Sequence, residues 1–184
     1  MKKNIIIFTD SGDTLVNEST QIYDSADPEC VIKADLIENA GQVIEELHDA
    51  GYRIALVADG NTRSFRNVLG EHDLLSCFEA MIISEEVGEQ KPSRKMFDTA
   101  MKAMGLEESD KSRIIMVGNN LKKDIAGAND YGITSVWLDW SPRYSHKYEE
   151  PSWKPDYIIH HPSELPWLIR GLENEFSNKR DTGE

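Results

Sequence analysis

The sequence predicts an α/β fold in which a parallel, Rossmann-like sheet lies between two layers of helices. Short apolar segments alternate with amphipathic segments along the chain, and this alternation is typical of a parallel sheet covered on both faces. The length of 184 residues suits one ordinary domain. We therefore expect a single three-layer α/β/α domain over residues 1–176, followed by a flexible tail over 177–184.

Six short apolar runs are the expected strands. They cover residues 4–10, 53–59, 80–84, 113–118, 134–139 and 156–160. The amphipathic segments between and after them are the expected helices, at residues 35–51, 64–72, 93–106, 121–132 and 163–176. In the first of these, Ile37, Ile44 and Leu47 recur at helical spacing, and Gly51 stands where the helix should end.

The composition limits the classes of partner. Hydrophobic residues make up 39% of the chain and charged residues 29%, and the formal net charge is −13. This charge argues against nucleic acid or an anionic membrane as the main partner. Cys30 and Cys77 have no metal-site spacing, and no secretory or membrane-spanning segment stands out. We expect a reduced, cytoplasmic protein.

Polar side chains stand at the ends of four expected strands. Asp10 and Asp13 follow the first, Asp59 and Gly60 the second, Lys91 the third, and Asn119 and Asp124 the fourth. In open parallel sheets the carboxyl ends of the strands meet at one edge, where ligands bind. Carboxylates, a lysine and glycine-containing turns therefore converge there.

These groups suit phosphoryl transfer. An aspartate can attack phosphorus to form an aspartyl phosphate. Magnesium accepts one or two carboxylates together with substrate oxygens, a lysine offsets the accumulated negative charge, and backbone N–H groups can hold the phosphate.

Three motifs in this order resemble the haloacid dehalogenase (HAD) superfamily, most of whose members are magnesium-dependent phosphatases. They are "DSGDTL" with Asp10 and Thr14, "GEQKPSRKMF" with Lys91, and "VGNNLKKDIAGANDYGI" with Asp124. The resemblance implies that Asp10 is the nucleophile and Lys91 its cationic partner. It also implies a Mg²⁺ site and a phosphate site. The implied metal ligands are Asp10, Gly12, Asn119 and Asp124, and the implied phosphate-binding residues are Ser11, Gly12, Asp59, Gly60 and Lys91.

The chain departs from the family pattern at three motif positions. Gly12 stands where the family has its second aspartate, the proton-transfer residue, and Ala58 stands where it has Ser or Thr. Asn119 stands where the family has a magnesium-binding aspartate. Because the amide of Asn119 brings no charge, weaker metal binding is expected. Asp13 is either a displaced acid/base or a residue that fixes the turn.

The chain has no room for a cap domain, because only residues 17–36 separate the first motif from the next helix. We expect a short flap or linker there, an open site, and an aromatic loop at residues 140–155 that reaches the same rim. The loop contributes to substrate selection or self-association, or it packs its own aromatic side chains.

The sequence is compatible with two functions. The first is a magnesium-assisted phosphatase acting on phosphoric monoesters or acyl phosphates through Asp10. The second is a catalytically impaired member that binds a phosphorylated ligand or a protein partner. The expected partners are a phosphorylated small molecule or macromolecule, with a homo-oligomer as an alternative in which a neighbouring subunit covers the site.

Overall fold

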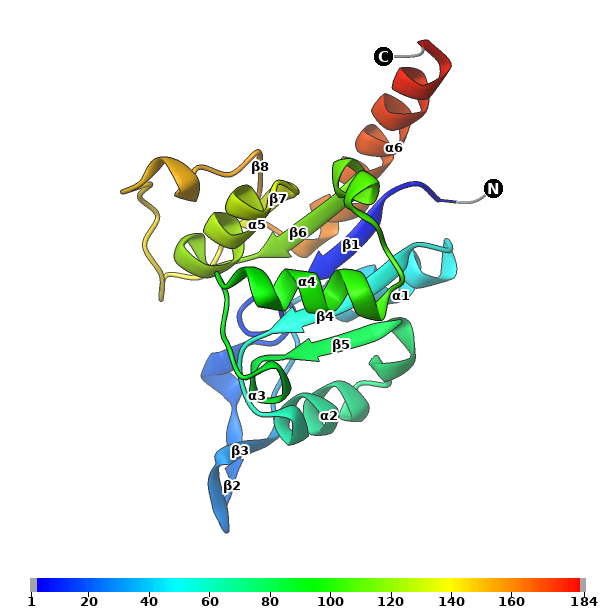
Figure 1. Ribbon diagram of the computed structural model, residues 1–184. Coiled ribbons are helices and arrows are strands. Elements are labelled where there is room, and N and C mark those ends of the chain that lie inside the picture. Colours follow the sequence, from blue (N-terminus) through cyan, green and yellow to red (C-terminus); the bar gives the residue numbers. More distant parts are fainter. Residues whose placement is uncertain (1–2, 183–184) are drawn as a thin grey trace.

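The computed structural model describes residues 3–182, which form a six-stranded parallel sheet between two layers of helices (Figure 1). The strand order is β5-β4-β1-β6-β7-β8, and every neighbouring pair is parallel. The strands are β1 (Ile6–Thr9), β4 (Arg53–Ala58), β5 (Ala80–Ile83), β6 (Ile114–Gly118), β7 (Thr134–Leu138) and β8 (Tyr157–Ile159). All six coincide with the segments predicted from the sequence, so the predicted fold class is confirmed.

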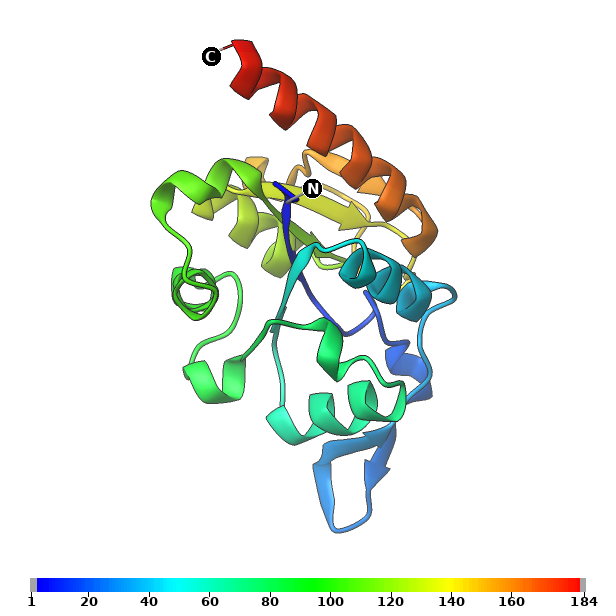
Figure 2. The same cartoon turned by 90° about the vertical axis from the view of Figure 1, so that its right-hand side faces the viewer.

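The helices cover both faces of the sheet, as Figures 1 and 2 show from two directions. They are α1 (Ala40–Asp49), α2 (Thr62–Glu71), α3 (Ser84–Val87), α4 (Arg94–Ala103), α5 (Ala126–Tyr131) and α6 (Leu165–Thr182). Side chains of β1 alternate between the two layers. Ile7 belongs to the apolar core under α1, α2 and α6, whereas Ile6 and Phe8 belong to the core under α4 and α5.

A β-hairpin takes the place of a cap domain. Its strands are β2 (Ile22–Asp24) and β3 (Asp27–Lys33), which pair antiparallel, and it projects from the edge of the sheet where the parallel strands end (Figure 1). The backbone N–H of Val31 donates to the Ser64 hydroxyl at 2.9 Å, which ties β3 to α2. The prediction of a capless fold is confirmed.

Two local features differ from the sequence-based expectation. The hairpin strands were not predicted, because its largest apolar residues, Ile22, Tyr23 and Ile32, are exposed and give no pattern of burial. The predicted tail is helical up to Thr182, because residues 172–182 contain neither proline nor glycine to end α6; residues 183–184 lie outside the described part. None of the helices within residues 3–182 is long and apolar enough to cross a membrane.

Candidate active site at the carboxyl ends of the strands

A cavity of about 230 Å³ opens at the carboxyl ends of the central strands. Its floor includes Asp10, Lys91 and Asp124, and its wall is built from the hairpin, α2 and the aromatic loop. The wall residues include Tyr23 and Val31 of the hairpin, Phe65 of α2 and Tyr144 of the loop, together with Glu18 from the helical turn before the hairpin. The site expected to be open is therefore partly enclosed by segments outside the sheet.

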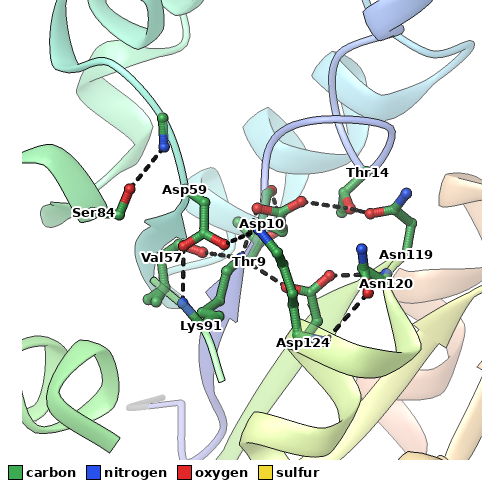
Figure 3. Close-up of polar contacts among 12 residues, drawn as sticks. Thr9, Asp10, Thr14, Val57, Asp59, Ser84, Lys91, Asn119, Asn120 and Asp124 are labelled. Atoms are coloured by element: carbon green, nitrogen blue, oxygen red, sulfur yellow. Dashed lines mark hydrogen bonds and ion pairs between the residues drawn. The ribbon is translucent and has the colours of Figure 1, made fainter. Parts of the chain in front are cut away.

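Lys91 joins the two carboxylates expected to be central to the site (Figure 3). Its Nζ atom lies 2.7 Å from Asp10 Oδ1 and 2.7 Å from Asp124 Oδ1, and it donates to the Val57 carbonyl oxygen at 2.7 Å. The Lys91 and Asp124 side chains are each 1% exposed, whereas that of Asp10 is 13% exposed. Asp10 is therefore the carboxylate of this trio that an incoming ligand reaches.

Burial and mutual charge shift the pKa values of Lys91 and Asp124. Desolvation by itself would lower the pKa of Lys91, but the charges of Asp10, Asp124 and Asp59 outweigh it and raise the pKa above its ordinary value. Burial raises the pKa of Asp124 above the usual carboxyl range, and the charge of Lys91 opposes that shift. Lys91 therefore stays cationic at neutral pH and holds the negative charges together.

Asp124 is positioned by the residues that precede its helical turn. Asn120 caps the turn Leu121–Ile125 by accepting hydrogen bonds from the N–H groups of Lys122 and Lys123. Asp124 Oδ2 in return accepts from the Asn120 N–H at 3.0 Å. A Cβ atom at position 118 would lie 2.3 Å from the Asp124 carboxylate, so the glycine that ends β6 makes room for it.

The turn after β1 contains backbone donors that the described residues leave unused. The Ser11 carbonyl accepts from the N–H groups of the next turn, whereas the N–H groups of Ser11 and Gly12 have no acceptor among the described residues. Both residues line the cavity. This arrangement supports the expected phosphate-binding role of Ser11 and Gly12.

Asp59 and Gly60, which were also expected to bind phosphate, form hydrogen bonds to other groups of the protein. Asp59 accepts from the Lys91 N–H at 3.0 Å and from Lys123 Nζ at 2.9 Å, and the Gly60 N–H donates to the Ser84 hydroxyl at 2.9 Å. Asp59 thus positions Lys91 and Lys123, and its negative charge is unsuited to direct phosphate contact. Lys123, which the sequence analysis did not single out, is the cation that Asp59 places at the cavity.

Asp13 turns away from the cavity and fixes the turn. Its φ angle is 48°, and it is not among the residues that line the cavity. Its carboxylate accepts from the Glu18 N–H at 3.0 Å and the Ser141 hydroxyl at 3.3 Å, and it pairs with Arg143 at 3.2 Å. Of the two roles considered for Asp13, these contacts support the structural one.

Glu18 is the carboxylate that the sequence analysis missed. It lines the cavity, pairs with Arg143 at 3.0 Å and accepts from the Tyr144 hydroxyl at 3.5 Å. Burial, together with the charge of Asp13, raises the pKa of Glu18, and Arg143 partly offsets the shift. A single glutamate in a polar segment gives no sequence pattern that separates it from a solvated one.

The aromatic loop packs on the sheet and reaches the site. Tyr148 packs edge-on against Trp137 of β7, with ring centroids 5.8 Å apart, so its aromatic partner comes from the sheet and not from the loop itself. Trp140 Nε1 also donates to the Asp13 carbonyl at 2.6 Å, and Tyr144 lines the cavity. The loop therefore reaches the rim on which the catalytic candidates lie.

The donor set near Asp10 fits a magnesium ion. Asn119 Nδ2 is buried without a hydrogen-bond partner among the described residues, whereas Asp124 Oδ1 is paired with Lys91 Nζ at 2.7 Å. Unpaired buried polar atoms commonly mark the place of an ion or ligand, and the Asn119 amide can turn to present its oxygen. Within residues 3–182 no three His, Cys, Asp or Glu side chains form a metal-binding group, but Mg²⁺ needs only one or two carboxylates.

The fold and these residues define a hydrolase of the haloacid dehalogenase type. The family model described as "Haloacid dehalogenase-like hydrolase" matches residues 6–138. The chain belongs to this family, as the sequence motifs indicated.

Individual relatives are phosphatases. The chain is 30% identical over 145 residues to glyceraldehyde 3-phosphate phosphatase of Pyrococcus furiosus, a match that covers 79% of this chain and 58% of that protein. It thus spans little more than half of the length of this curated relative. A solved HAD phosphatase from Thermococcus onnurineus superimposes with a TM-score of 0.73 at 20% identity, over 92% of this chain and 98% of the other.

A second solved structure is magnesium-bound. The HAD-hydrolase YfnB from Bacillus subtilis aligns with a TM-score of 0.64 and 24% identity, over 73% of this chain and 56% of that one. At this identity the likeness establishes the fold. The family match and the curated phosphatase relative support phosphatase activity at the level of the family, and magnesium is typical of its members.

Proposed function

We propose that this protein is a magnesium-assisted phosphatase that hydrolyses phosphoric monoesters or acyl phosphates through an aspartyl phosphate on Asp10. The observation that carries the proposal is the partly exposed Asp10 carboxylate, held 2.7 Å from the buried Lys91 ammonium at the cavity floor. A carboxylate fixed in this way is aimed at the cavity without paying for reorganisation.

The surrounding groups have complementary roles. Asp10 attacks phosphorus. During this attack Lys91 balances the negative charges of Asp10 and Asp124. The N–H groups of Ser11 and Gly12 are suited to the phosphoryl oxygens, and Lys123 adds a positive charge at the cavity. Magnesium, held by Asp10, Asp124, Asn119 and the Gly12 carbonyl, would neutralise further charge on the phosphate.

The cavity favours a small phosphorylated substrate. Its volume of about 230 Å³ is below the usual range for drug-sized ligands, and residues of the hairpin and Tyr144 form part of its lining. We propose that the aromatic loop contributes to substrate selection through Tyr144. A macromolecular substrate would have to present its phosphate on an extended group.

A binding function without turnover is the second candidate. Gly12 removes the carboxylate that transfers protons in the family, and Asn119 removes a charge from the metal site. A protein impaired in this way would still bind a phosphorylated ligand at the N–H groups of Ser11 and Gly12. Binding alone would leave no covalent intermediate on Asp10.

The test is hydrolysis of p-nitrophenyl phosphate by the purified protein, with and without magnesium, beside an Asp10→Asn control. We expect magnesium-dependent release that is absent from the control. Borohydride reduction during turnover releases phosphate from an aspartyl phosphate and converts that aspartate to homoserine, so peptide mass analysis should find homoserine at position 10. Phosphate binding with no release above the Asp10→Asn control would contradict the phosphatase and support the binding function.

A further inference from the structure

Glu18 places a carboxylate directly over the glycine at position 12. A Cβ atom added to Gly12 would lie 2.1 Å from Glu18 Oε1 and 2.8 Å from Glu18 Cδ. Both distances are well below van der Waals contact, so the Glu18 carboxylate fills the volume in which a side chain at position 12 would begin. Glu18, Gly12 and Asp10 all line the same cavity.

Two separate segments hold Glu18 in this position. Its backbone N–H donates to Asp13 Oδ1 at 3.0 Å, and its Oε2 atom pairs with Arg143 at 3.0 Å and accepts from the Tyr144 hydroxyl at 3.5 Å. Because Oε2 is held from the aromatic loop, Oε1 is the atom directed at Gly12. The side chain is 27% exposed, so it is anchored and still open to the cavity.

We propose that Glu18 is a catalytic residue that supplies the proton-transfer carboxylate missing at position 12. This proposal rests on the proposed phosphatase function. An oxygen of Asp10 forms a bond to phosphorus while the bond to the leaving-group oxygen breaks, and that oxygen takes the proton of the Glu18 carboxyl group. The Glu18 carboxylate then takes a proton from water, whose oxygen bonds to phosphorus as the Asp10–phosphorus bond breaks. Inorganic phosphate leaves, and Asp10 and protonated Glu18 are restored.

A purely structural role is the competing explanation. In that case Glu18 would serve only as a partner for Arg143. Arg143, however, already pairs with the buried Asp13 at 3.2 Å, so it does not require Glu18 for charge neutralisation. The glycine at position 12 has a direct explanation under the proposal, because any side chain there would displace the Glu18 carboxylate.

The first test compares Glu18→Gln with Glu38→Gln, an exposed carboxylate between the hairpin and α1. The probes are β-glycerophosphate, a poor leaving group, and p-nitrophenyl phosphate, a good one. For Glu18→Gln we expect kcat/KM on the poor leaving group to fall by about 10²–10⁴. On the nitrophenyl ester kcat/KM should stay near the wild-type value, while a stoichiometric burst of nitrophenolate precedes slow turnover. Glu38→Gln should match the wild type on both esters.

The second test moves the carboxylate back to position 12. Gly12→Asp alone should impair the enzyme, because the new side chain meets Glu18. In the double variant with Glu18→Ala that volume is free, and we expect activity on β-glycerophosphate to rise at least about tenfold above Glu18→Ala. This gain also separates proton transfer from a structural effect, since the contact with Arg143 is absent in both proteins.

Different outcomes would overturn the role of Glu18 and the phosphatase function on which it rests. Asp10-dependent turnover with unchanged kcat/KM on β-glycerophosphate and no burst in Glu18→Gln would overturn the role of Glu18 alone. Absence of Asp10-dependent release in the wild type, on both esters, would overturn the phosphatase itself and the Glu18 proposal with it.

Discussion

Lys91 Nζ lies 2.7 Å from Asp10 Oδ1, although the two residues are 81 positions apart in the sequence. The same ammonium lies 2.7 Å from Asp124 Oδ1, and its side chain is 1% exposed. One buried cation thus balances two carboxylates, one directly after β1 and one in the helical turn that follows β6.

Replacing Lys91 should destabilise the protein as well as inactivate it. Lys91→Met leaves Asp10 and Asp124 without their cation, and removal of one partner from a buried ion pair costs about 3–5 kcal/mol. We expect this loss in the free energy of unfolding at pH 7, measured by urea denaturation without magnesium. An exposed-lysine control, Lys147→Met, should leave the free energy of unfolding unchanged.

The penalty of Lys91→Met should depend on pH. Because the pKa of Lys91 is raised, the stabilisation linked to protonation of Lys91 is fully present below its unfolded pKa of about 10.5 and is lost only in stronger alkali. In the variant the buried Asp124, whose pKa is already raised, takes up a proton as the pH falls. The difference between the two proteins should therefore shrink between pH 7 and pH 5. A constant difference over this range would argue against the pairing.

Asp13→Asn should weaken the fold without showing a defect in proton transfer. Asparagine tolerates the positive φ at this position, but it loses the charge that pairs with Arg143. A loss of about 1–3 kcal/mol in unfolding free energy is expected. The ratio of kcat/KM for p-nitrophenyl phosphate to that for β-glycerophosphate should stay at its wild-type value. A large rise in that ratio would instead make Asp13 the acid/base.

Gly118→Ala should disturb the site from the end of β6. Its Cβ atom would lie 2.3 Å from the Asp124 carboxylate, which is buried and bonded to the Asn120 N–H. We expect a destabilisation of about 1–3 kcal/mol, as for other overpacked cores, and loss of hydrolysis. The matched control is Gly171→Ala in α6, where the added Cβ meets no described atom within 4 Å beyond its chain neighbours and its own helix backbone; it should raise the thermal midpoint. Full activity in Gly118→Ala would show that Asp124 is dispensable.

Asn119→Asp should strengthen magnesium binding. The amide of Asn119 brings no charge to a site whose other side-chain donors are Asp10 and Asp124, and the affinity of such sites follows ligand charge. We expect the magnesium concentration for half-maximal activity to fall about tenfold, which corresponds to about 1.4 kcal/mol. Calorimetric titration with Mg²⁺ provides a readout independent of turnover, with Asn119→Ala as the control that should bind more weakly. Equal affinity in all three proteins would place the metal elsewhere.

The fold was predictable from local sequence patterns. Each buried strand is a short apolar run, and each long helix carries an apolar face, because burial imposes these periods on the residues themselves. Asp10, Lys91 and Asp124 were predictable for a related reason, since they follow strands whose carboxyl ends share one edge. The motif resemblance then assigned them roles that the structure supports by bringing them together.

Only the tertiary structure decided which second carboxylate lies at the cavity with Asp10. Asp13 is nearer in sequence, but its φ of 48° and its contacts with Ser141 and Arg143 direct it away from the cavity. Glu18 reaches the cavity because residues of the aromatic loop, more than a hundred positions later, hold its Oε2 atom. No local pattern encodes contacts between such distant segments. The sequence by itself therefore determined the sheet and its catalytic edge, whereas side-chain direction at that edge depended on packing of the aromatic loop against residues 13–18.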